Sequence, residues 1–319
     1  MTDLEQTVAK LATGRNGVVV ATITGDRVEV RGTAGLDAST RFEIGSVTKV
    51  FTALTLARLA VAGVVALDEP LSDLGFTVPS RGGVPITLRH LATHTSGLPR
   101  LPTGMLLGAL LHPSKPDPYA GCSSSMLEKA LERTRLSAVP GRRFRYSNFG
   151  AGLLGLALSR RAGLNYEALV AREISGVLGL TATSVAGGVT QGYRKVGRPV
   201  PPWDLADLAG AGGLRSTVAD LAAFVRAQWD PESELAPAVQ VALGVQHRVN
   251  PFLTARLGWF SRRVKGGPAQ FFHNGSTGGF GAFAGFDRER RVGVVALSDT
   301  RRSVDGAAFE LLTALQSHR

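Results

Sequence analysis

The order of hydrophobic and polar positions divides the chain into three stretches. In the first stretch, the patterns predict a helix at 3–12, strands at 17–23 and 26–35 around a turn at 24–26, and a long helix at 46–62. The last of these is apolar almost all the way round, which is typical of a helix buried in a core. Gly63 follows it directly and predicts the end of the helix.

The second and third stretches differ in their periodicity. Between 64 and 210, loops rich in proline and glycine separate segments with helical spacing at 86–94, 124–136, 149–163 and 166–179. A further helix is predicted at 211–227, where Thr217 and Asp220 have the spacing of a capping box. Strand patterns then follow at 255–264, 269–275, 280–289 and 291–299, and a last helix at 303–316.

Strands at both ends and helices in the middle predict an α/β (α+β) fold. The simplest arrangement is one antiparallel sheet built from both termini and flanked by the terminal helices, with an all-helical domain inserted into it. The predicted boundaries are 1–63 and 211–319 for the sheet domain and 64–210 for the helical domain. We expect the functional site in the cleft between them, because such clefts are favoured binding sites.

Composition narrows the possible classes of protein. The 319 residues are 44% hydrophobic, yet no charge-free apolar run reaches the ~18 residues of a membrane span. The net charge of +11 comes mainly from arginines scattered in short groups such as 141–145 and 287–291. Because no continuous basic run is present, we expect no nucleic-acid partner and no membrane partner. Cys122 is the single cysteine, which rules out an intrachain disulfide.

The first residues carry no signal that directs export. They lack a basic start followed by an apolar stretch, and the run at 17–22 is too short for a signal core. The expectation is therefore a cytoplasmic protein, or an extracytoplasmic one if a leader has been removed from the sequence.

Ser46 and Lys49 stand out at the start of the predicted long helix. Residues three positions apart on a helix share one face, so the two side chains should touch. A lysine in an apolar helix is partly desolvated, which lowers its pKa and makes it a general base for the serine hydroxyl. The alternative is an N-capping serine beside a lysine that extends to solvent, and the four-residue pattern alone favours this alternative.

Two further segments carry candidate chemistry. Tyr146 and Asn148 precede the helix predicted at 149–163, where they could be a packing residue and a helix cap. If Tyr146 instead lay beside Lys49, the positive charge would lower the pKa of its phenol. His273 ends a predicted strand and is followed by Gly275, whose lack of a side chain lets a ligand approach the backbone.

The motifs Ser46-Val-Thr-Lys49, Tyr146-Ser-Asn148 and His273-Asn-Gly275 follow one another in this order, about a hundred residues apart. Together they resemble the S-x-x-K, Y-x-N and [K/H]-x-G motifs of the serine β-lactamase and penicillin-binding-protein superfamily. The surrounding stretches resemble its class C branch and cover roughly residues 15 to 300; they include FEIGSVTKVFTAL, ITLRHLATHTSGLP, AGGLRSTVADLAAF and HNGSTGGF. The family fold, an antiparallel sheet with helices and an all-helical domain, agrees with the order of elements predicted above.

The resemblance implies an acyl-enzyme mechanism. Ser46 would attack a carbonyl, while Lys49 and Tyr146 would share the work of base and acid. The backbone N–H groups of Ser46 and Ser276 would form the oxyanion hole, in which losing one donor costs about 10²–10³ in rate. Asn148 would orient the substrate amide or ester.

One departure from the family pattern concerns the third motif. Members that act on penicillins commonly carry Lys-Thr-Gly there, whereas His273 is largely neutral near pH 7 and, with Gly275, would line the far wall of the cleft. The H-x-G variant is familiar in family members that act as esterases, D-aminopeptidases and acyltransferases. We therefore predict a serine hydrolase that cleaves an ester or amide, in the manner of esterases, carboxypeptidases or β-lactamases. Acyl transfer in metabolism is the alternative, followed by a non-catalytic binding module.

We expect a small-molecule or peptide-like acyl substrate and no cofactor or metal. His90 and His94 have the i, i+4 spacing of zinc ligands, but no glutamate follows His90 and no third ligand is evident. Specificity is assigned to the loops at 100–121 and 197–210, whose apolar composition suggests an apolar acyl or leaving group. The sequence does not identify the substrate or the oligomeric state.

Overall fold

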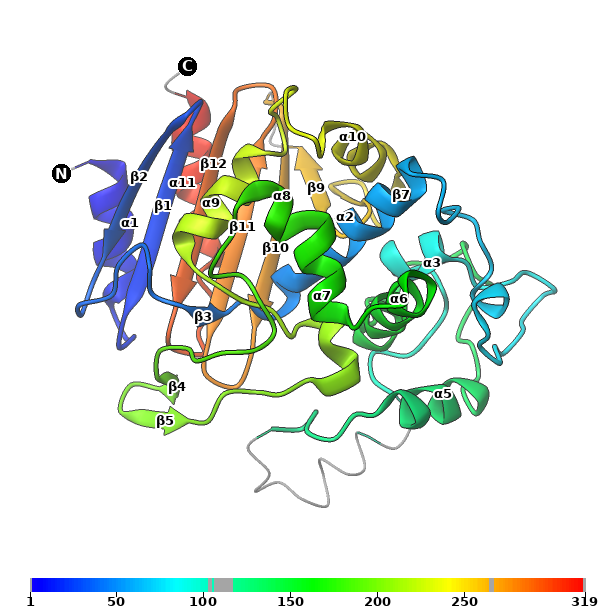
Figure 1. Cartoon of the computed structure of the whole chain (residues 1–319). Coiled ribbons are helices and arrows are strands. Elements are labelled where there is room, and N and C mark those ends of the chain that lie inside the picture. Colours follow the sequence, from blue (N-terminus) through cyan, green and yellow to red (C-terminus); the bar gives the residue numbers. More distant parts are fainter. Residues whose placement is uncertain (1, 103–104, 106–116, 264–266, 318–319) are drawn as a thin grey trace.

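A computed structural model describes residues 2–102, 105, 117–263 and 267–317. An antiparallel sheet of eight strands forms its centre, in the order β2-β1-β12-β11-β10-β9-β8-β7 (Figure 1). The strands are β1 (Val18–Thr24), β2 (Arg27–Gly32), β7 (His247–Arg248), β8 (Leu253–Ala255), β9 (Phe260–Arg263), β10 (Ala269–Ser276), β11 (Gly281–Asp287) and β12 (Val292–Ser298). The prediction of one antiparallel sheet built from both ends of the chain is confirmed.

Alternate residues of the sheet face two separate hydrophobic clusters. On β1, Val18 and Val20 pack with α1 (Asp3–Ala12) and α11 (Asp305–Ser317), whereas Val19, Ala21 and Ile23 belong to the larger cluster on the opposite face. Two layers of helices therefore cover the sheet, because side chains of a strand point alternately to its two faces. Residues of α2 (Thr48–Val61) and α9 (Val218–Arg226) belong to the larger cluster.

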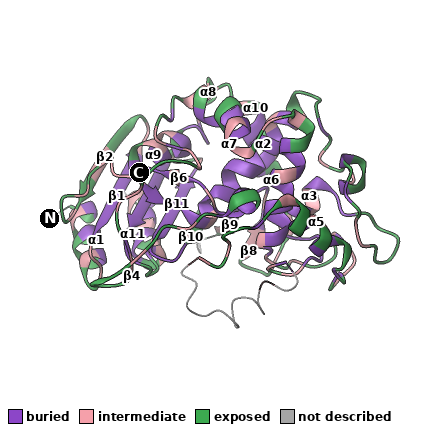
Figure 2. Ribbon diagram, turned by 60° about the horizontal axis from the view of Figure 1, so that its bottom comes forward, coloured by how far each residue is buried: buried purple, intermediate pink, exposed green. Residues whose placement is uncertain are grey.

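Helix α2 runs through the middle of the molecule and is buried along most of its length (Figure 2). It ends as predicted: Gly63 adopts a φ of +70°, and the N–H groups of Gly63 and Val64 donate to the carbonyls of Ala60 and Leu59. Its start differs from the prediction, because Ser46 lies in the 3₁₀ turn η1 (Gly45–Val47) and not in the α-helix itself.

The remaining helical segments lie mainly between β2 and β7 in the chain. They are η2 (Leu71–Leu74), α3 (Leu88–Ala92), α5 (Ser124–Glu132), α6 (Asn148–Ala162), α7 (Tyr166–Val170), η3 (Ala171–Ser175), α8 (Gly176–Leu178) and η4 (Ala206–Ala211). The helix predicted at 166–179 is interrupted by η3, which is a π-helical turn. The boundaries assigned to the two domains stay a prediction.

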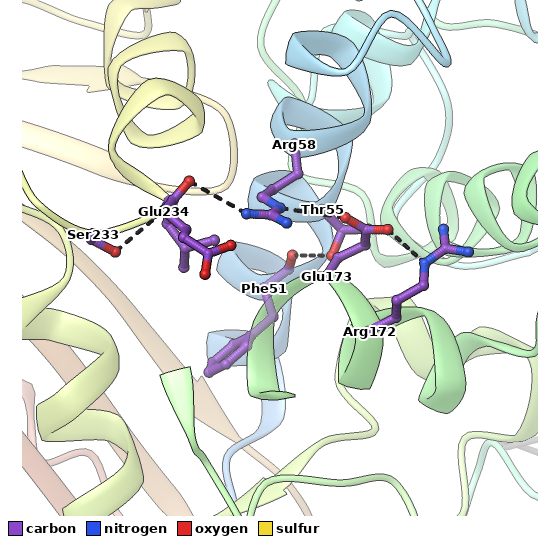
Figure 3. A network of polar contacts seen from close by, with 8 residues as sticks. Phe51, Thr55, Arg58, Arg172, Glu173, Ser233 and Glu234 are labelled. Carbon is purple, nitrogen blue, oxygen red and sulfur yellow. Dashed lines mark hydrogen bonds and ion pairs between the residues drawn. The ribbon is translucent and has the colours of Figure 1, made fainter. Parts of the chain in front are cut away.

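A network of polar side chains joins η3 to the last turn of α2 (Figure 3). Glu173 accepts from Arg58 Nε at 3.4 Å and from Arg172 Nε at 2.7 Å, and its side chain is 12% exposed. Arg58 also donates to the carbonyl of Glu234, and the hydroxyl of Thr55 donates to the carbonyl of Phe51. The network thus joins three segments that are distant in the chain.

Several predicted elements need correction. The helix predicted at 211–227 begins at Val218 because Thr217 caps it. The carboxylate of Asp220 does not complete a capping box; it accepts from the backbone N–H of Ala182 and the hydroxyl of Thr183. The strand predicted at 255–264 is broken into β8 and β9 by a turn at Gly258, whose φ is +73°. The periodicity also missed α10 (Ala236–Gly244), β7, and the short pairs β3 (Phe42–Glu43) with β6 (Arg215–Ser216) and β4 (Gly192–Lys195) with β5 (Arg198–Val200).

Within the described residues, no helix is both long and apolar enough to cross a membrane.

Candidate active site

Ser46 and Lys49 lie side by side, as their spacing predicts. The Nζ atom of Lys49 is 2.9 Å from Oγ of Ser46 and donates to the carbonyl of Ala211 at 2.5 Å. One turn further along α2, the hydroxyl of Thr52 donates to the carbonyl of Gly210 at 2.8 Å. These polar side chains of α2 hold η4 against the helix, and η4 in turn fixes the position of the lysine.

The electrostatic surroundings of Lys49 favour its neutral form. Its side chain is buried, with 3% of the residue exposed, and among the described residues no carboxylate forms an ion pair with it. Burial holds the pKa of Lys49 well below its usual range, and the positive charge of Arg100 lowers this pKa further. The alternative of a lysine that extends to solvent is therefore wrong.

Tyr146 joins this pair, but its electrostatics contradict the prediction. Lys49 Nζ lies over the face of its ring, 5.0 Å from the centroid, and the phenol hydrogen-bonds to the Ser46 side chain. Burial raises the pKa of Tyr146 to about 12, and the hydrogen bond and the charge of Arg100 offset this only in part. The expected lowered pKa is wrong because desolvation of the phenolate outweighs the nearby positive charges.

His94 holds Tyr146 in place, a role that the sequence did not suggest. Its ring lies 4.4 Å from that of Tyr146, centroid to centroid, and its Nδ1 accepts from the backbone N–H of Ser147 at 3.2 Å. The carbonyl of His94 accepts from Arg145 N–H, and the residue adopts a left-handed φ of 58°. His90 instead accepts from Thr87 N–H at the start of α3, so the two histidines serve different contacts.

The third motif lies on β10, directly beside the turn that carries Ser46. A side chain at Gly275 would collide with the carbonyl of Ile44 and approach the backbone N of Ser46 at 3.0 Å. A side chain at Gly45, whose φ is +50°, would approach the backbone N of Ser276 at 2.8 Å. Two glycines thus allow the main chains of η1 and β10 to lie in contact, and this contact brings the proposed oxyanion-hole residues Ser46 and Ser276 together.

His273 is buried and uncharged. Its Nδ1 donates to the carbonyl of Asn274 at 2.7 Å, while its Nε2 is buried without a hydrogen-bond partner among the described residues. Burial and the charge of Lys49 lower the pKa of His273 to about 3. The same two causes, burial first, hold the pKa of His94 well below its usual range.

A narrow pocket of about 20 Å³ joins the three motifs. It is lined by Gly45, Ser46, Tyr119, Asn148, Trp203, Leu205, Ala211, Gly212, Ser276 and Thr277. Asn148 hydrogen-bonds to the phenol of Tyr119, and its buried Oδ1 has no hydrogen-bond partner among the described residues. The structure therefore brings together the residues that the sequence assigned to the site. Tyr146 links Lys49 and His273, because its ring centroid lies 5.0 Å from Lys49 Nζ and 6.4 Å from the ring centroid of His273. His273 itself is buried and does not line the pocket, which differs from the expected place on the cleft wall.

The two loops assigned to specificity supply part of the pocket lining. Tyr119 comes from the first loop and Trp203 and Leu205 from the second, and the rings of Tyr119 and Trp203 lie 5.1 Å apart. The backbone N–H of Trp203 donates to the buried carboxylate of Glu43 at 2.5 Å, which fixes this wall. Residues 103–104 and 106–116 of the first loop lie outside the described residues.

Comparison with known proteins identifies the family to which the chain belongs. The sequence profile of the family described as Beta-lactamase matches residues 4–316. A β-lactamase of Pseudomonas fluorescens is 29% identical over 304 residues, which cover 82% of this chain and 80% of that protein. The D-alanyl-D-alanine-carboxypeptidase/endopeptidase AmpH of Escherichia coli K12 is 35% identical over 184 residues, which cover 56% of this chain and 46% of that protein. The match thus spans about half the length of that relative.

Solved structures show the same fold. A β-lactamase/D-alanine carboxypeptidase from Yersinia pestis, complexed with citrate, superposes with a TM-score of 0.80 at 25% identity over 97% of both chains. A β-lactamase/D-alanine carboxypeptidase from Pseudomonas syringae superposes with a TM-score of 0.82 at 20% identity over 99% of this chain and 98% of that one. Because the family profile spans nearly the whole chain, the protein belongs to the β-lactamase family of serine hydrolases.

Proposed function

We propose that the protein hydrolyses an ester or amide through an acyl-enzyme formed on Ser46. The neutral amine of Lys49 accepts the proton of the Ser46 hydroxyl as Ser46 attacks the substrate carbonyl. The backbone N–H groups of Ser46 and Ser276 stabilise the negative charge that develops on the carbonyl oxygen. As the bond between the carbonyl carbon and the leaving group breaks, Tyr146 gives its phenol proton to the leaving group and takes up the proton held by Lys49. Water then attacks the acyl group by the reverse steps and returns a proton to Ser46.

The single observation that carries this proposal is the 2.9 Å contact between Lys49 Nζ and Ser46 Oγ in a buried setting. An amine with a lowered pKa at hydrogen-bond distance from a hydroxyl is a general base beside a nucleophile. The close approach of η1 and β10 at Gly45 and Gly275 supports the oxyanion hole.

The pocket also limits the substrate. Its volume of about 20 Å³ is far below the roughly 300–1,000 Å³ of sites that enclose a ligand. The scissile bond would enter the pocket, and the rest of a small-molecule or peptide-like acyl substrate would contact its rim. The relatives are named for β-lactams and D-alanyl-D-alanine peptides. The buried, neutral His273 offers no positive charge on β10 for the carboxylate that such substrates carry.

A substrate panel tests the proposal. Chromogenic esters, D-amino-acid amides and one chromogenic β-lactam are assayed with the wild type and Ser46→Ala, and intact mass is recorded after a slow acylating agent. We expect ester hydrolysis and a mass addition mapped to Ser46, both absent from Ser46→Ala. The absence of turnover and of any adduct in the wild type contradicts the proposal. Ester products formed on adding an alcohol would indicate acyl transfer in place of hydrolysis.

A further inference from the structure

Arg100 places a positive charge beside Tyr146 and the start of α6. Its guanidinium carbon lies 5.6 Å from the ring centroid of Tyr146, and the residue is exposed. Its carbonyl accepts the backbone N–H groups of Asn148 and Phe149 at 2.9 and 3.2 Å. Arg100 is thus bound to the start of α6, next to the side chain expected to orient the substrate.

Within the part of the chain that the structure describes, no carboxylate forms an ion pair with Arg100. All aspartates and glutamates of the chain lie within the described residues, and none of them pairs with Arg100. Arginines elsewhere do pair, as in Arg89–Asp68 and Arg160–Glu128. Asp117, which lies near Tyr119, accepts instead from the backbone N–H groups of Tyr119 and Asp204.

Arg100 differs in this respect from the other basic groups of the site. Lys49 is buried and bonded to Ser46 and Ala211, and His273 on β10 is buried and uncharged, so that neither presents a positive charge to the pocket. The guanidinium of Arg100 lies 5.6 Å from the ring centroid of Tyr146, and its charge acts to lower the pKa values of Lys49, Tyr146 and Tyr119. An exposed cation is therefore available beside Asn148, whereas the histidine of the third motif on β10 is buried and uncharged.

We propose that Arg100 selects substrates whose acyl part carries a carboxylate, which the guanidinium binds while Asn148 orients the adjoining amide or ester. A guanidinium can bind a carboxylate through two parallel hydrogen bonds, which adds geometric selectivity to the charge. The unpartnered Oδ1 of Asn148 is the acceptor for an N–H group next to the scissile carbonyl. This inference rests on the proposed hydrolysis at Ser46.

A matched pair of esters tests the inference. The 4-nitrophenyl monoester of glutaric acid carries an acyl carboxylate, and 4-nitrophenyl valerate has a neutral acyl chain of the same carbon number. We expect the ratio of their kcat/KM values, corrected for uncatalysed hydrolysis, to fall by about tenfold in Arg100→Gln. Arg31→Gln removes a positive charge from an exposed position of β2, the edge strand separated from β10 by three strands, and should leave the ratio unchanged. Because both esters depend equally on the pKa of Lys49, the ratio cancels the effect of Arg100 on that pKa.

A second pair separates the acyl part from the leaving group. The esters 3-carboxy-4-nitrophenyl valerate and 4-nitrophenyl valerate differ by a carboxylate on the leaving group only. An Arg100-dependent preference confined to this pair, or a glutarate preference that persists in Arg100→Gln, overturns the inference. If wild type hydrolyses neither acyl ester in a Ser46-dependent manner, the proposed function fails and the inference falls with it. If valerate is hydrolysed at Ser46 without any preference for glutarate, the inference alone fails.

Discussion

The two ends of helix α2 handle buried charge in opposite ways. Lys49 in the first turn has no carboxylate partner among the described residues, whereas Arg58 in the last turn is bonded to Glu173 (Figure 3). The two residues are nine positions apart, or about 13 Å along the helix. Arg58 at one end of α2 is therefore ionised and paired, whereas the surroundings of Lys49 at the other end favour the neutral amine.

The difference indicates what each end contributes. Pairing and hydrogen bonds offset part of the free-energy cost of burying a charge, and through them Glu173 joins α2 to η3. An unpaired buried amine lowers stability, but its lowered pKa makes it a base. We therefore expect substitutions at the first end to change activity and those at the second end to change stability.

Lys49→Met should produce the largest effect. Loss of the general base should lower kcat/KM for ester hydrolysis by about 10³-fold or more. The unfolding free energy at pH 7 should not fall, because methionine fills a similar volume and removes a desolvated amine. Steady-state assays measure kcat/KM, and urea unfolding measures the free energy of unfolding. Lys129→Met, at an exposed position of α5, is the control for replacing a lysine by methionine.

The pH dependence of stability sharpens this prediction. Because the pKa of Lys49 is lowered on folding, the unfolded chain binds its proton more tightly, and the wild type gains stability as pH rises toward about 10.4. Lys49→Met lacks this gain, so its advantage should shrink over that range. A variant that is markedly less stable than the wild type at pH 7 would contradict the comparison.

Much of the fold could be predicted because its elements follow strong patterns. The buried strands β11 and β12, and the helix ended by Gly63, have clear apolar runs and end signals. The missed elements are short: β3 and β6 consist of two residues each and exist only because distant segments meet. The turn at Gly258 could not be predicted either, since its packing against the backbone of α2 is a tertiary contact.

The site was predictable to the extent that its motifs are local. Ser46 and Lys49 are neighbours through helical spacing alone, whereas His94 contacts Tyr146 only because the chain returns to the same place. The pKa of Tyr146 shows the limit most clearly. The sequence indicated the nearby positive charge, but not the burial that raises this pKa to about 12.

Glu173→Ala tests the paired end of α2 and should produce the second largest effect. Removing the carboxylate leaves Arg58, whose side chain is 22% exposed, without its partner, and should lower the unfolding free energy by about 2–3 kcal/mol. The kcat/KM of the folded fraction should stay within about threefold of wild type, because the network does not contact the pocket.

Arg172→Ala is the matched control for Glu173→Ala. The side chain of Arg172 is 50% exposed, so its bond to Glu173 should contribute less than about 1 kcal/mol. Chemical unfolding of both variants measures the difference. If Arg172→Ala costs as much stability as Glu173→Ala, the burial of Arg58 is not what gives the network its strength.

His273→Gln should produce the smallest effect. It tests, through stability alone, whether the buried imidazole near the Lys49 end of α2 stays uncharged. The pKa of His273 is about 3 in the folded protein, below its ordinary value near 6.5, so the unfolded chain binds more protons between these values. The contribution of His273 to stability therefore falls as pH decreases through 6.5, by about 1 kcal/mol between pH 7 and pH 5.5. Glutamine does not titrate, so the variant should lose that much less over the same interval. Urea unfolding at the two pH values measures the change. An equal loss of stability in the variant and the wild type would mean that His273 becomes protonated in the folded protein. The surroundings of Lys49 would then tolerate a positive charge as readily as the end of α2 that holds Arg58.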